Sequence, residues 1–300
     1  MKKSNMTLIL ALVLCVLALG VLAACGRSND DTIRIGSKNF SENLIVAELY
    51  ALALEDAGHT VERKFNVAGS LLHPAITNNE IDLYPEYTGT ALLSILKMDV
   101  MTDPQEVYEL VKREFYDRYE LTWLNSTGVH NGQGLVLRTD VAERLGIRTI
   151  SDLQRYADQI RFASQGEFDY REDGLPGLAR VYGEFNFKSS TVYDNALKYQ
   201  VLENNEADLA PAYTTDGQLS RTDVFTLLED DLRAWPPYYL APVVRNDLLE
   251  ARADVADVLN RVSAHLNSQV MTELNAQVDV HRREFDEVAR EFFNEIRATW

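Results

Sequence analysis

Short β-forming segments alternate with amphipathic helical segments from Ile33 onward, and this order limits the chain to a small set of folds. Ile33-Arg34-Ile35-Gly36 alternates as a strand does, a helical pattern from Leu44 to Leu54 stops at Gly58, and Thr60 to Asn66 is again rich in β-formers. We find no internal repeat in this pattern. It predicts α/β layers built around mainly parallel sheets.

The other expected elements follow the same order. Further strands are predicted at residues 81–84, 134–138, 160–164, 207–212 and 224–228. Helices are predicted at residues 88–96, from Pro104 to Phe115, at residues 195–204 and throughout the segment after Asp247. In open α/β sheets, ligands bind beyond the carboxyl ends of the strands, where the loops converge. We therefore look for a binding site in the loops at residues 37–42, 84–90, 130–134, 167–177, 212–217 and 235–242.

The amino-terminal segment differs from the rest of the chain. Lys2 and Lys3 precede a run from Thr7 to Ala24 that carries no charge, and Leu22-Ala23-Ala24-Cys25-Gly26 then resembles a bacterial lipobox. Residues 1–24 are thus expected to be a lipoprotein signal peptide and residues 25–32 a polar tether, with Cys25 carrying the lipid. The alternative is an uncleaved anchor helix, against which the small residues before Cys25 argue.

Length, charge and cysteine content exclude several classes of protein. The 300 residues, with 46% apolar and 25% charged side chains, suit a soluble protein of two lobes. The net charge of −17 argues against nucleic acid as a partner, because phosphate binding needs a basic patch. Cys15 and Cys25 are the only cysteines, so we expect neither a disulfide nor a cysteine metal site in the mature chain.

Tyrosine dominates the aromatic content of the predicted loops. The chain has 14 tyrosines and 3 tryptophans. Several tyrosines stand close to proline or glycine, in Tyr84-Pro85-Glu86-Tyr87-Thr88-Gly89, Pro211-Ala212-Tyr213 and Pro236-Pro237-Tyr238-Tyr239. A methylated ammonium group cannot donate a hydrogen bond, but each electron-rich ring face contributes about 0.5–2 kcal/mol to holding it. Tyrosines at the edge of a core would give the same pattern without any such cage.

Five motifs, in order along the chain, resemble those of one family: Ile35-Gly36-Ser37-Lys38-Asn39-Phe40-Ser41-Glu42, Asp82-Leu83-Tyr84-Pro85-Glu86-Tyr87-Thr88-Gly89-Thr90, Asp173-Gly174-Leu175-Pro176-Gly177-Leu178, Thr215-Asp216-Gly217, and Pro236-Pro237-Tyr238 with Ala241-Pro242-Val243-Val244-Arg245. They are similar to the glycine betaine/carnitine/choline-binding lipoproteins of osmoprotectant ABC importers, from about Ile33 to Phe293. The resemblance implies an α/β, type II periplasmic-binding-protein-like fold with a ligand cleft between two lobes. It places residues 33–133 and 236–300 in lobe 1 and residues 134–235 in lobe 2.

The resemblance also implies which residues bind the solute. It assigns Tyr87, Tyr213 and Tyr238 to an aromatic cage, and Lys38, Thr90 and Arg171 to the solute's carboxylate. The residue types agree, because Lys38 and Arg171 are cationic donors and Thr90 supplies a hydroxyl. The plainer alternatives are an exposed loop lysine at 38, a surface arginine paired with its acidic neighbours at 171, and Tyr239 in place of Tyr238.

The loop Asn131-Gly132-Gln133-Gly134 departs from the family pattern. Gln133 falls where relatives carry a further cage tyrosine, and an amide cannot replace a ring in a cation–π contact. We count Asn131 and Gln133 as candidate ligand-binding residues. Either Gln133 shapes the pocket for a betaine with an extra polar group, such as carnitine or ergothioneine, or it points elsewhere and His130, Tyr84 or Tyr239 completes the cage.

These patterns predict a binding protein and not an enzyme. The chain has no nucleotide-binding fingerprint, no histidine pair at zinc spacing and no serine elbow, so we expect no catalysis, no cofactor and no metal site. By resemblance, we expect an extracytoplasmic protein, lipid-anchored to the cell membrane, that captures a quaternary-ammonium solute for an ABC permease and its ATPase. Two alternatives remain open: a surface sensor or adhesion module on the same fold, and a site for another small cation such as a polyamine.

Overall fold

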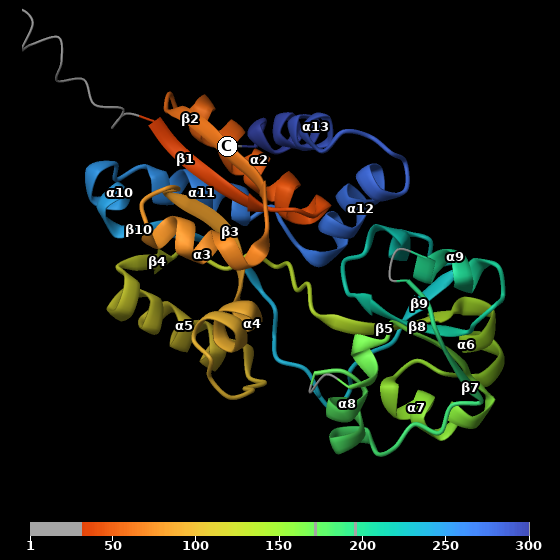
Figure 1. The fold of residues 1–300 in the computed structure, drawn as a ribbon. Helices are drawn as coiled ribbons and strands as arrows, with labels where there is room; N and C mark the ends of the chain where they lie inside the picture. The colour runs from red at the N-terminus through yellow and green to blue at the C-terminus, as the bar shows by residue number, and fades with distance from the viewer. Residues whose placement is uncertain (1–31, 171–172, 195–196, 300) are drawn as a thin grey trace, which may run out of the picture.

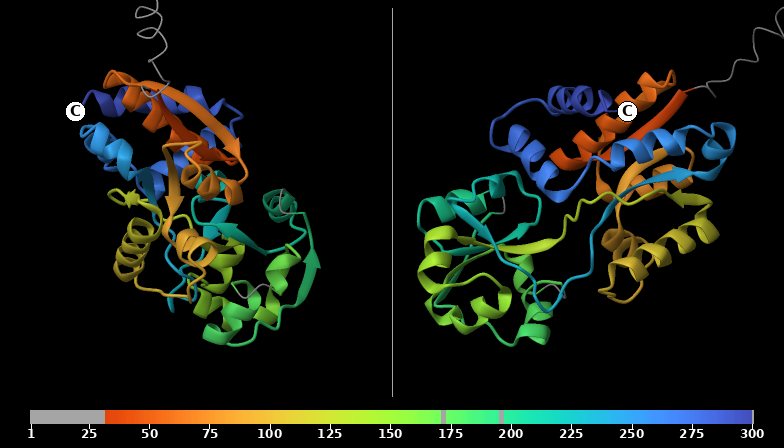
Figure 2. Two further views of the ribbon diagram at one scale, coloured as in Figure 1. Left: turned by 60° about the vertical axis from the view of Figure 1, so that its left-hand side comes forward. Right: turned by 180° about the vertical axis from the view of Figure 1, so that it is seen from behind.

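The computed structural model describes residues 32–170, 173–194 and 197–299. The predicted signal peptide, Cys25 and Arg171 lie outside these ranges. Two lobes, each built around a five-stranded sheet, are joined by two segments that cross between them, residues 124–132 and 228–239 (Figures 1 and 2). The predicted α/β fold of two lobes is confirmed.

The first sheet takes its strands from both ends of the described chain. In spatial order they are β2 (Thr60–Val67), β1 (Thr32–Lys38), β3 (Leu83–Tyr87), β10 (Leu240–Arg245) and β4 (Leu121–Trp123). β1 pairs with β2 and β3 in parallel, whereas β10 is antiparallel to both β3 and β4.

The second sheet repeats this arrangement. Its spatial order is β7 (Ser189–Val192), β6 (Arg161–Ser164), β8 (Leu209–Tyr213), β5 (Gln133–Arg138) and β9 (Phe225–Leu227). β6 is parallel to β7 and β8, and β5 is antiparallel to β8 and β9.

The expectation of mainly parallel sheets is met only in part, because both sheets are mixed: one strand in each, β10 or β5, runs against the other four. β10 and β5 each follow a segment that crosses from the other lobe. β10 begins opposite Tyr87, the last residue of β3, and β5 begins opposite Tyr213, the last residue of β8. A strand that enters a sheet at the carboxyl ends of its neighbours has to run antiparallel to them.

Helices cover both sheets. In the first lobe they are α2 (Ser41–Asp56), α3 (Gly69–Thr77), α4 (Thr88–Thr90), the π-helix η1 (Ala91–Ile95), α5 (Pro104–Tyr119), α10 (Asn246–Ala251), α11 (Val255–Ser263), α12 (Ser268–Asp279) and α13 (Phe285–Arg297). In the second they are α6 (Thr139–Leu145), α7 (Ile150–Arg155), α8 (Leu175–Tyr182), α9 (Lys198–Glu203) and the short helices η2 (Ala157–Gln159), η3 (Glu167–Asp169) and η5 (Gly217–Ser220).

Helix α2 is the centre of the first lobe. The carboxyl-terminal helices α11, α12 and α13 all pack on it, so the end of the chain returns to the lobe in which the described chain starts (Figure 1). Most of α2 is buried as a result. Among the described residues, no helix is both long enough and apolar enough to cross a membrane.

Some strand predictions need correction. The strand expected at residues 81–84 lies further along, as β3, and the strands β4, β7 and β10 were not predicted. Pro242 stands in the middle of β10. A proline has no N–H to donate to a neighbouring strand. Here the carbonyl of Pro242 accepts from the Leu124 N–H at 3.0 Å, and the Leu124 carbonyl accepts from the Tyr108 hydroxyl at 2.7 Å.

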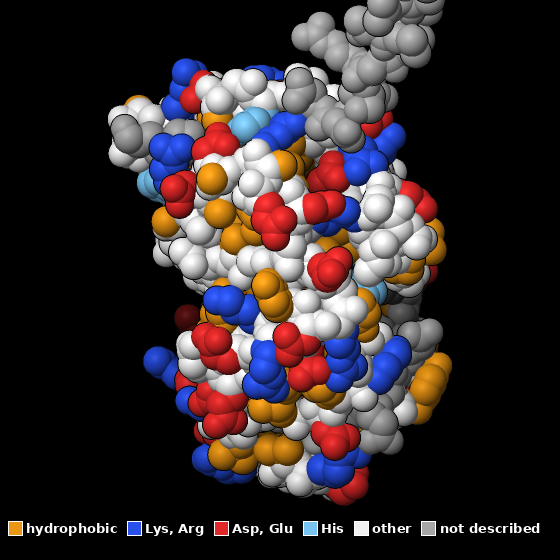
Figure 3. All heavy atoms as spheres, turned by 90° about the vertical axis from the view of Figure 1, so that its left-hand side faces the viewer, with side chains coloured by type: hydrophobic (Ala, Val, Ile, Leu, Met, Phe, Trp, Pro, Cys, Tyr) orange, Lys and Arg blue, Asp and Glu red, His pale blue; other side chains and the backbone are white. Residues whose placement is uncertain are grey.

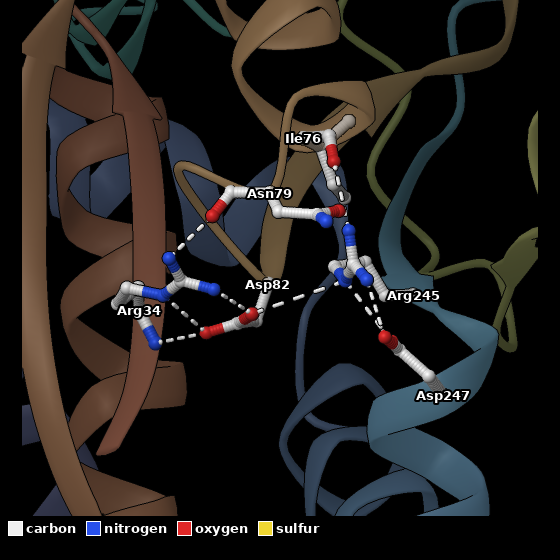
Figure 4. Close-up of polar contacts among 6 residues, drawn as sticks. All are labelled: Arg34, Ile76, Asn79, Asp82, Arg245 and Asp247. Atoms are coloured by element: carbon white, nitrogen blue, oxygen red, sulfur yellow. Dashed lines mark hydrogen bonds and ion pairs between the residues drawn. The ribbon is translucent and has the colours of Figure 1, made fainter. Parts of the chain in front are cut away.

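The two lobes contain the same arginine–aspartate arrangement at the start of equivalent strands. In the first lobe Arg34 of β1 donates through Nε and Nη2 to Asp82 at 2.9 and 2.6 Å, and through Nη1 to the Asn79 carbonyl (Figure 4). In the second lobe Arg161 of β6 donates to Asp208 over the same two distances, and to the Asn205 carbonyl.

This equivalence shows a repeat in the sequence, and our finding of no internal repeat is wrong. Residues 78–88 and 204–214 share the pattern Asn-Asn-Glu-x-Asp-Leu-x-Pro-x-Tyr-Thr. Asn79 and Asn205 both adopt a left-handed backbone, with φ of 62° and 57°. Tyr87 and Tyr213 therefore occupy the same position, at the end of equivalent strands in the two lobes.

Acidic and basic side chains are interspersed on the face of the molecule that Figure 3 shows. Several charged side chains of the molecule form ion pairs across neighbouring elements, as Arg63 does with Glu48 and Glu55. This face carries no continuous basic surface of the kind that nucleic acid needs.

Candidate functional site

A cavity of about 680 Å³ lies between the lobes, where the carboxyl ends of the parallel strands meet. Seven of the eight ligand-binding residues predicted from the sequence line it: Lys38, Tyr87, Thr90, Asn131, Gln133, Tyr213 and Tyr238. The eighth, Arg171, lies outside the described residues. The structure thus brings these side chains to one cavity, while their contacts with a ligand stay a prediction.

Four aromatic rings line this cavity, and they come from both lobes. Tyr87 ends β3, Tyr213 ends β8, and Tyr238 lies in the second crossing segment. The fourth is Phe40, which sequence reasoning missed. It precedes α2 and stacks on Tyr87 with ring centroids 6.2 Å apart. Its position directly after β1, within the motif Lys38-Asn39-Phe40, is the signal that could have found it.

Gly89 leaves room for the Tyr238 ring, since a Cβ atom there would lie 2.7 Å from two carbons of that ring. A Cβ atom on Gly132 would instead lie 2.7 Å from His130 Cε1 and an ordinary 3.4 Å from the Tyr238 ring. Tyr239 instead packs edge-on against His130, with centroids 5.1 Å apart. Tyr238 therefore lines the cavity, and Tyr239 is not among the described residues that do.

Gln133, the first residue of β5, also lines the cavity and pairs with Tyr213 across the sheet. Of the described residues considered as substitutes for it in the cage, His130, Tyr84 and Tyr239 are absent from the lining. The Tyr84 ring is fully buried in the core of the first lobe.

Lys38 is buried, so the alternative of an exposed loop lysine is wrong. Its Nζ donates to Glu86 and lies 5.0 Å from the centroid of the Tyr87 ring. Lys198, the first residue of α9, makes similar contacts in the second lobe. It pairs with Asp216 at 2.6 Å and lies 5.5 Å from the Tyr213 ring.

Glu42, near the start of α2, is a buried carboxylate in the wall of the cavity that sequence reasoning did not single out. Its Oε1 accepts from the Tyr87 hydroxyl at 2.7 Å and from Asn131 Nδ2 at 3.0 Å. Its Oε2 accepts from the Thr215 hydroxyl at 2.6 Å and from Asn275 Nδ2 at 3.2 Å. Burial raises the pKa of this carboxyl, and the four hydrogen bonds oppose that rise.

Three further carboxyl groups line the cavity, those of Asp173, Asp216 and Asp279. Asp279, at the end of α12, accepts a hydrogen bond from the Ser41 hydroxyl. Burial raises its pKa, and the nearby charge of Asp216 adds to that rise. Among the described lining residues acidic groups outnumber Lys38, the one basic group, so the cavity suits a ligand that carries positive charge.

The lobes touch beside this cavity. The backbone of η5 in the second lobe packs directly on α12 in the first, and a Cβ atom on Gly217 would lie 2.7 Å from the Ala276 nitrogen. Asn275 Nδ2 donates to the Thr215 carbonyl at 2.8 Å across the same contact. The cavity is therefore closed on this side by backbone packing that only glycine allows.

Residues 31–295 match the family model described as the substrate-binding domain of an ABC-type glycine betaine transport system. A glycine-betaine-binding protein of Pseudomonas aeruginosa is 32% identical over 292 residues, which cover 94% of this chain and 93% of the relative. The ergothioneine transport permease/ergothioneine binding protein EgtU of Helicobacter pylori is 29% identical over 264 residues. That match covers 87% of this chain and 47% of the relative, so the chain spans about half the relative's length.

The structure is also similar to solved structures of betaine-type transport proteins. The crystal structure of a glycine betaine/carnitine/choline ABC transporter protein superposes with a TM-score of 0.83 at 25% identity, covering 88% of this chain and 98% of that chain.

Proposed function

This chain belongs to the family of substrate-binding domains of ABC-type glycine betaine transport systems, and we propose that it captures a quaternary-ammonium solute for import. The solute would be glycine betaine, carnitine, choline or a related betaine. The family is one of binding domains and not of enzymes, and proteins of this kind work outside the cytoplasm. We further propose that Cys25 carries the lipid anchor and that a permease and an ATPase receive the solute.

The observation that carries this proposal is the set of four rings in one cavity. Tyr87 and Tyr213 come from equivalent strand ends of the two lobes, and Tyr238 and Phe40 stand beside them. Ring faces are what a protein can offer a cation that has no N–H to donate. A ligand that touches rings from both lobes stabilises the closed form by its differential affinity for that form.

The polar residues of the cavity would hold the rest of the solute. Lys38, Thr90 and Arg171 are proposed to meet a carboxylate, where the solute has one. Lys38 already pairs with Glu86, so it would share its donors between that partner and the solute. Asn131 and Gln133 would bind hydroxyl or amide-like groups.

A panel of solutes tests this function by ligand-induced thermal stabilisation. At saturating concentration we expect one or more of glycine betaine, carnitine, choline and ergothioneine to raise the Tm, and glycine, ethanolamine and putrescine to leave it unchanged. In the variant Tyr213→Ala the affinity for the best solute should fall by about tenfold, because one cation–π contact of about 1–2 kcal/mol is lost. Tyr213→Phe should keep most of it. A Tm rise with putrescine alone would contradict the cage and favour a polyamine site.

A second candidate solute is an ergothioneine-type betaine. Gln133 stands in the cavity where relatives have a ring, and one of the similar proteins is named for ergothioneine binding. An amide can hydrogen-bond to a polar ring attached to the betaine. If this is the solute, Gln133→Ala should weaken ergothioneine binding more than glycine betaine binding in isothermal titration.

A further inference from the structure

Glu42 differs from the other strongly buried carboxylates of the first lobe in what it pairs with. Its four hydrogen-bond partners, the Tyr87 and Thr215 hydroxyls and the Asn131 and Asn275 amides, are all neutral. Glu86, in the same strand as Tyr87, has Lys38 as its counter-ion, and Glu48, two turns along α2, has Arg63. Among the described residues, no lysine or arginine forms an ion pair with Glu42.

The hydrogen bonds favour the ionised form of this carboxylate, against the rise in pKa that burial causes. Each oxygen accepts twice, and an ionised carboxylate is an acceptor only, so these four donors match it without a proton. Four neutral donors distribute the charge but do not neutralise it. A buried charge without a counter-ion is destabilising, and a cation bound beside it would offset that destabilisation.

The same wall of the cavity holds two acceptor atoms without a hydrogen-bond partner. Asn131 and Asn275 line the cavity, and the Oδ1 atom of each is buried with no hydrogen-bond partner in the described structure. Together with Glu42 they make this wall rich in negative potential, and it lies beside the Tyr87 ring. The wall therefore attracts a group that brings positive charge into the cavity.

We propose that the Glu42 carboxylate is the counter-charge for the ammonium group of the solute and sets the requirement for a charged ligand. This inference rests on the proposed function and adds a residue that decides specificity. The carboxylate also acts through Tyr87. A phenol that donates to a carboxylate carries more electron density in its ring, which strengthens the face it presents to a cation.

The test compares each trimethylammonium solute with the analogue in which a neutral carbon atom replaces the ammonium nitrogen. Glycine betaine is paired with tert-butylacetate, and choline with neohexanol, so each pair has the same shape and differs by the positive charge. Isothermal titration gives the ratio of the affinity for the ammonium ligand to the affinity for its carbon analogue. In Glu42→Gln this ratio should fall at least tenfold relative to the parent protein. A purely structural role of Glu42 would weaken both members of a pair equally and leave the ratio unchanged, which would overturn the proposal.

Two further variants complete the experiment. Glu48→Gln is the matched control on the same helix, away from the cavity, and its ratio should equal that of the parent. Glu42→Asp keeps the charge and should keep the ratio within about threefold while both affinities fall. If Glu42→Gln does not fold, Glu42→Asp replaces it in the test. A ratio that falls tenfold or more in Glu42→Asp, although the charge is kept, would then overturn the proposal. If the parent protein bound no trimethylammonium solute, the proposed function itself would fail.

Discussion

At the scale of single residues, the Tyr238 ring depends on the absence of a side chain at Gly89. A Cβ atom there would lie 2.7 Å from the ring and 2.9 Å from the Pro237 carbonyl oxygen. That carbonyl accepts from the Thr88 hydroxyl at 2.9 Å, so the neighbouring backbone is also held. Neither the ring nor the carbonyl can yield without moving the crossing segment.

We therefore expect Gly89→Ala to displace Tyr238. Its free energy of unfolding should fall by about 1–3 kcal/mol, the usual cost of a side chain forced into a packed site, and its affinity for the best trimethylammonium solute should fall with it. Urea unfolding and isothermal titration measure the two effects. Gly69→Ala is the control, since its Cβ would meet its nearest neighbour, Lys38 Cδ, at an ordinary 3.5 Å. Equal stability of the two variants would refute the close contact.

At the scale of elements, the contact of η5 with α12 joins the lobes. Gly217 brings the two backbones together, and a Cβ atom there would meet Ala276 N and Asn275 C at 2.7 Å. Because both neighbours are backbone atoms of a helix, they cannot move aside as a flexible side chain can. Any side chain at residue 217 has to separate the lobes.

Gly217→Ala should thus weaken ligand binding with little effect on either lobe alone. We expect the dissociation constant to rise by about tenfold, corresponding to roughly 1.4 kcal/mol against the closed arrangement, and X-ray scattering to show a larger radius of gyration with ligand present. Ser220→Ala, at an exposed position of the same short helix, should change neither quantity. A Gly217→Ala protein that closes and binds as the parent does would show that this contact plays no part in closure.

At the scale of the whole molecule, buried and paired carboxyl groups give stability two opposite dependences on pH. The hydrogen bond from His59 lowers the pKa of Asp254, and burial raises the pKa of Asp279. A lowered pKa contributes stability above the ordinary value of 3.8 that is lost as the pH falls through the folded value. A raised pKa does the reverse, because the folded chain takes up its proton first and gains stability as the pH falls through the folded value.

Two variants separate these contributions. Asp279→Asn should be more stable than the parent at neutral pH, and this difference should disappear as the pH falls below the raised pKa of Asp279. Asp254→Asn should be less stable than the parent at neutral pH, with a difference that shrinks only below about pH 4, near the ordinary aspartate pKa. Urea unfolding at a series of pH values measures both. Parallel pH profiles for the three proteins would contradict the two assignments.

The two lobes also share one plan at this scale. An arginine–aspartate pair joins the start of β1 to the start of β3, and an equivalent pair joins β6 to β8; β3 and β8 each end in a tyrosine. Because the two lobes face each other across a cleft, these two equivalent rings lie at one cavity. The repeat of residues 78–88 at 204–214 was visible in the sequence, although its function is clear only when both strands are seen to end at the same cavity.

The sequence alone determined the features that depend on neighbouring residues. Periodicity located most strands and helices, prolines and glycines marked the loops that carry Tyr87, Tyr213 and Tyr238, and ordered motifs pointed to the family.

The tertiary structure decided the features that depend on residues far apart in the sequence. Strands β5 and β10 run antiparallel because they enter from the other lobe, which no local pattern records. Glu42 meets Thr215, 173 residues away, and Asn275, 233 residues away. From the sequence, a glutamate near the start of a helix is expected to be exposed. Glu42 is a buried charge only because three separate segments pack around it.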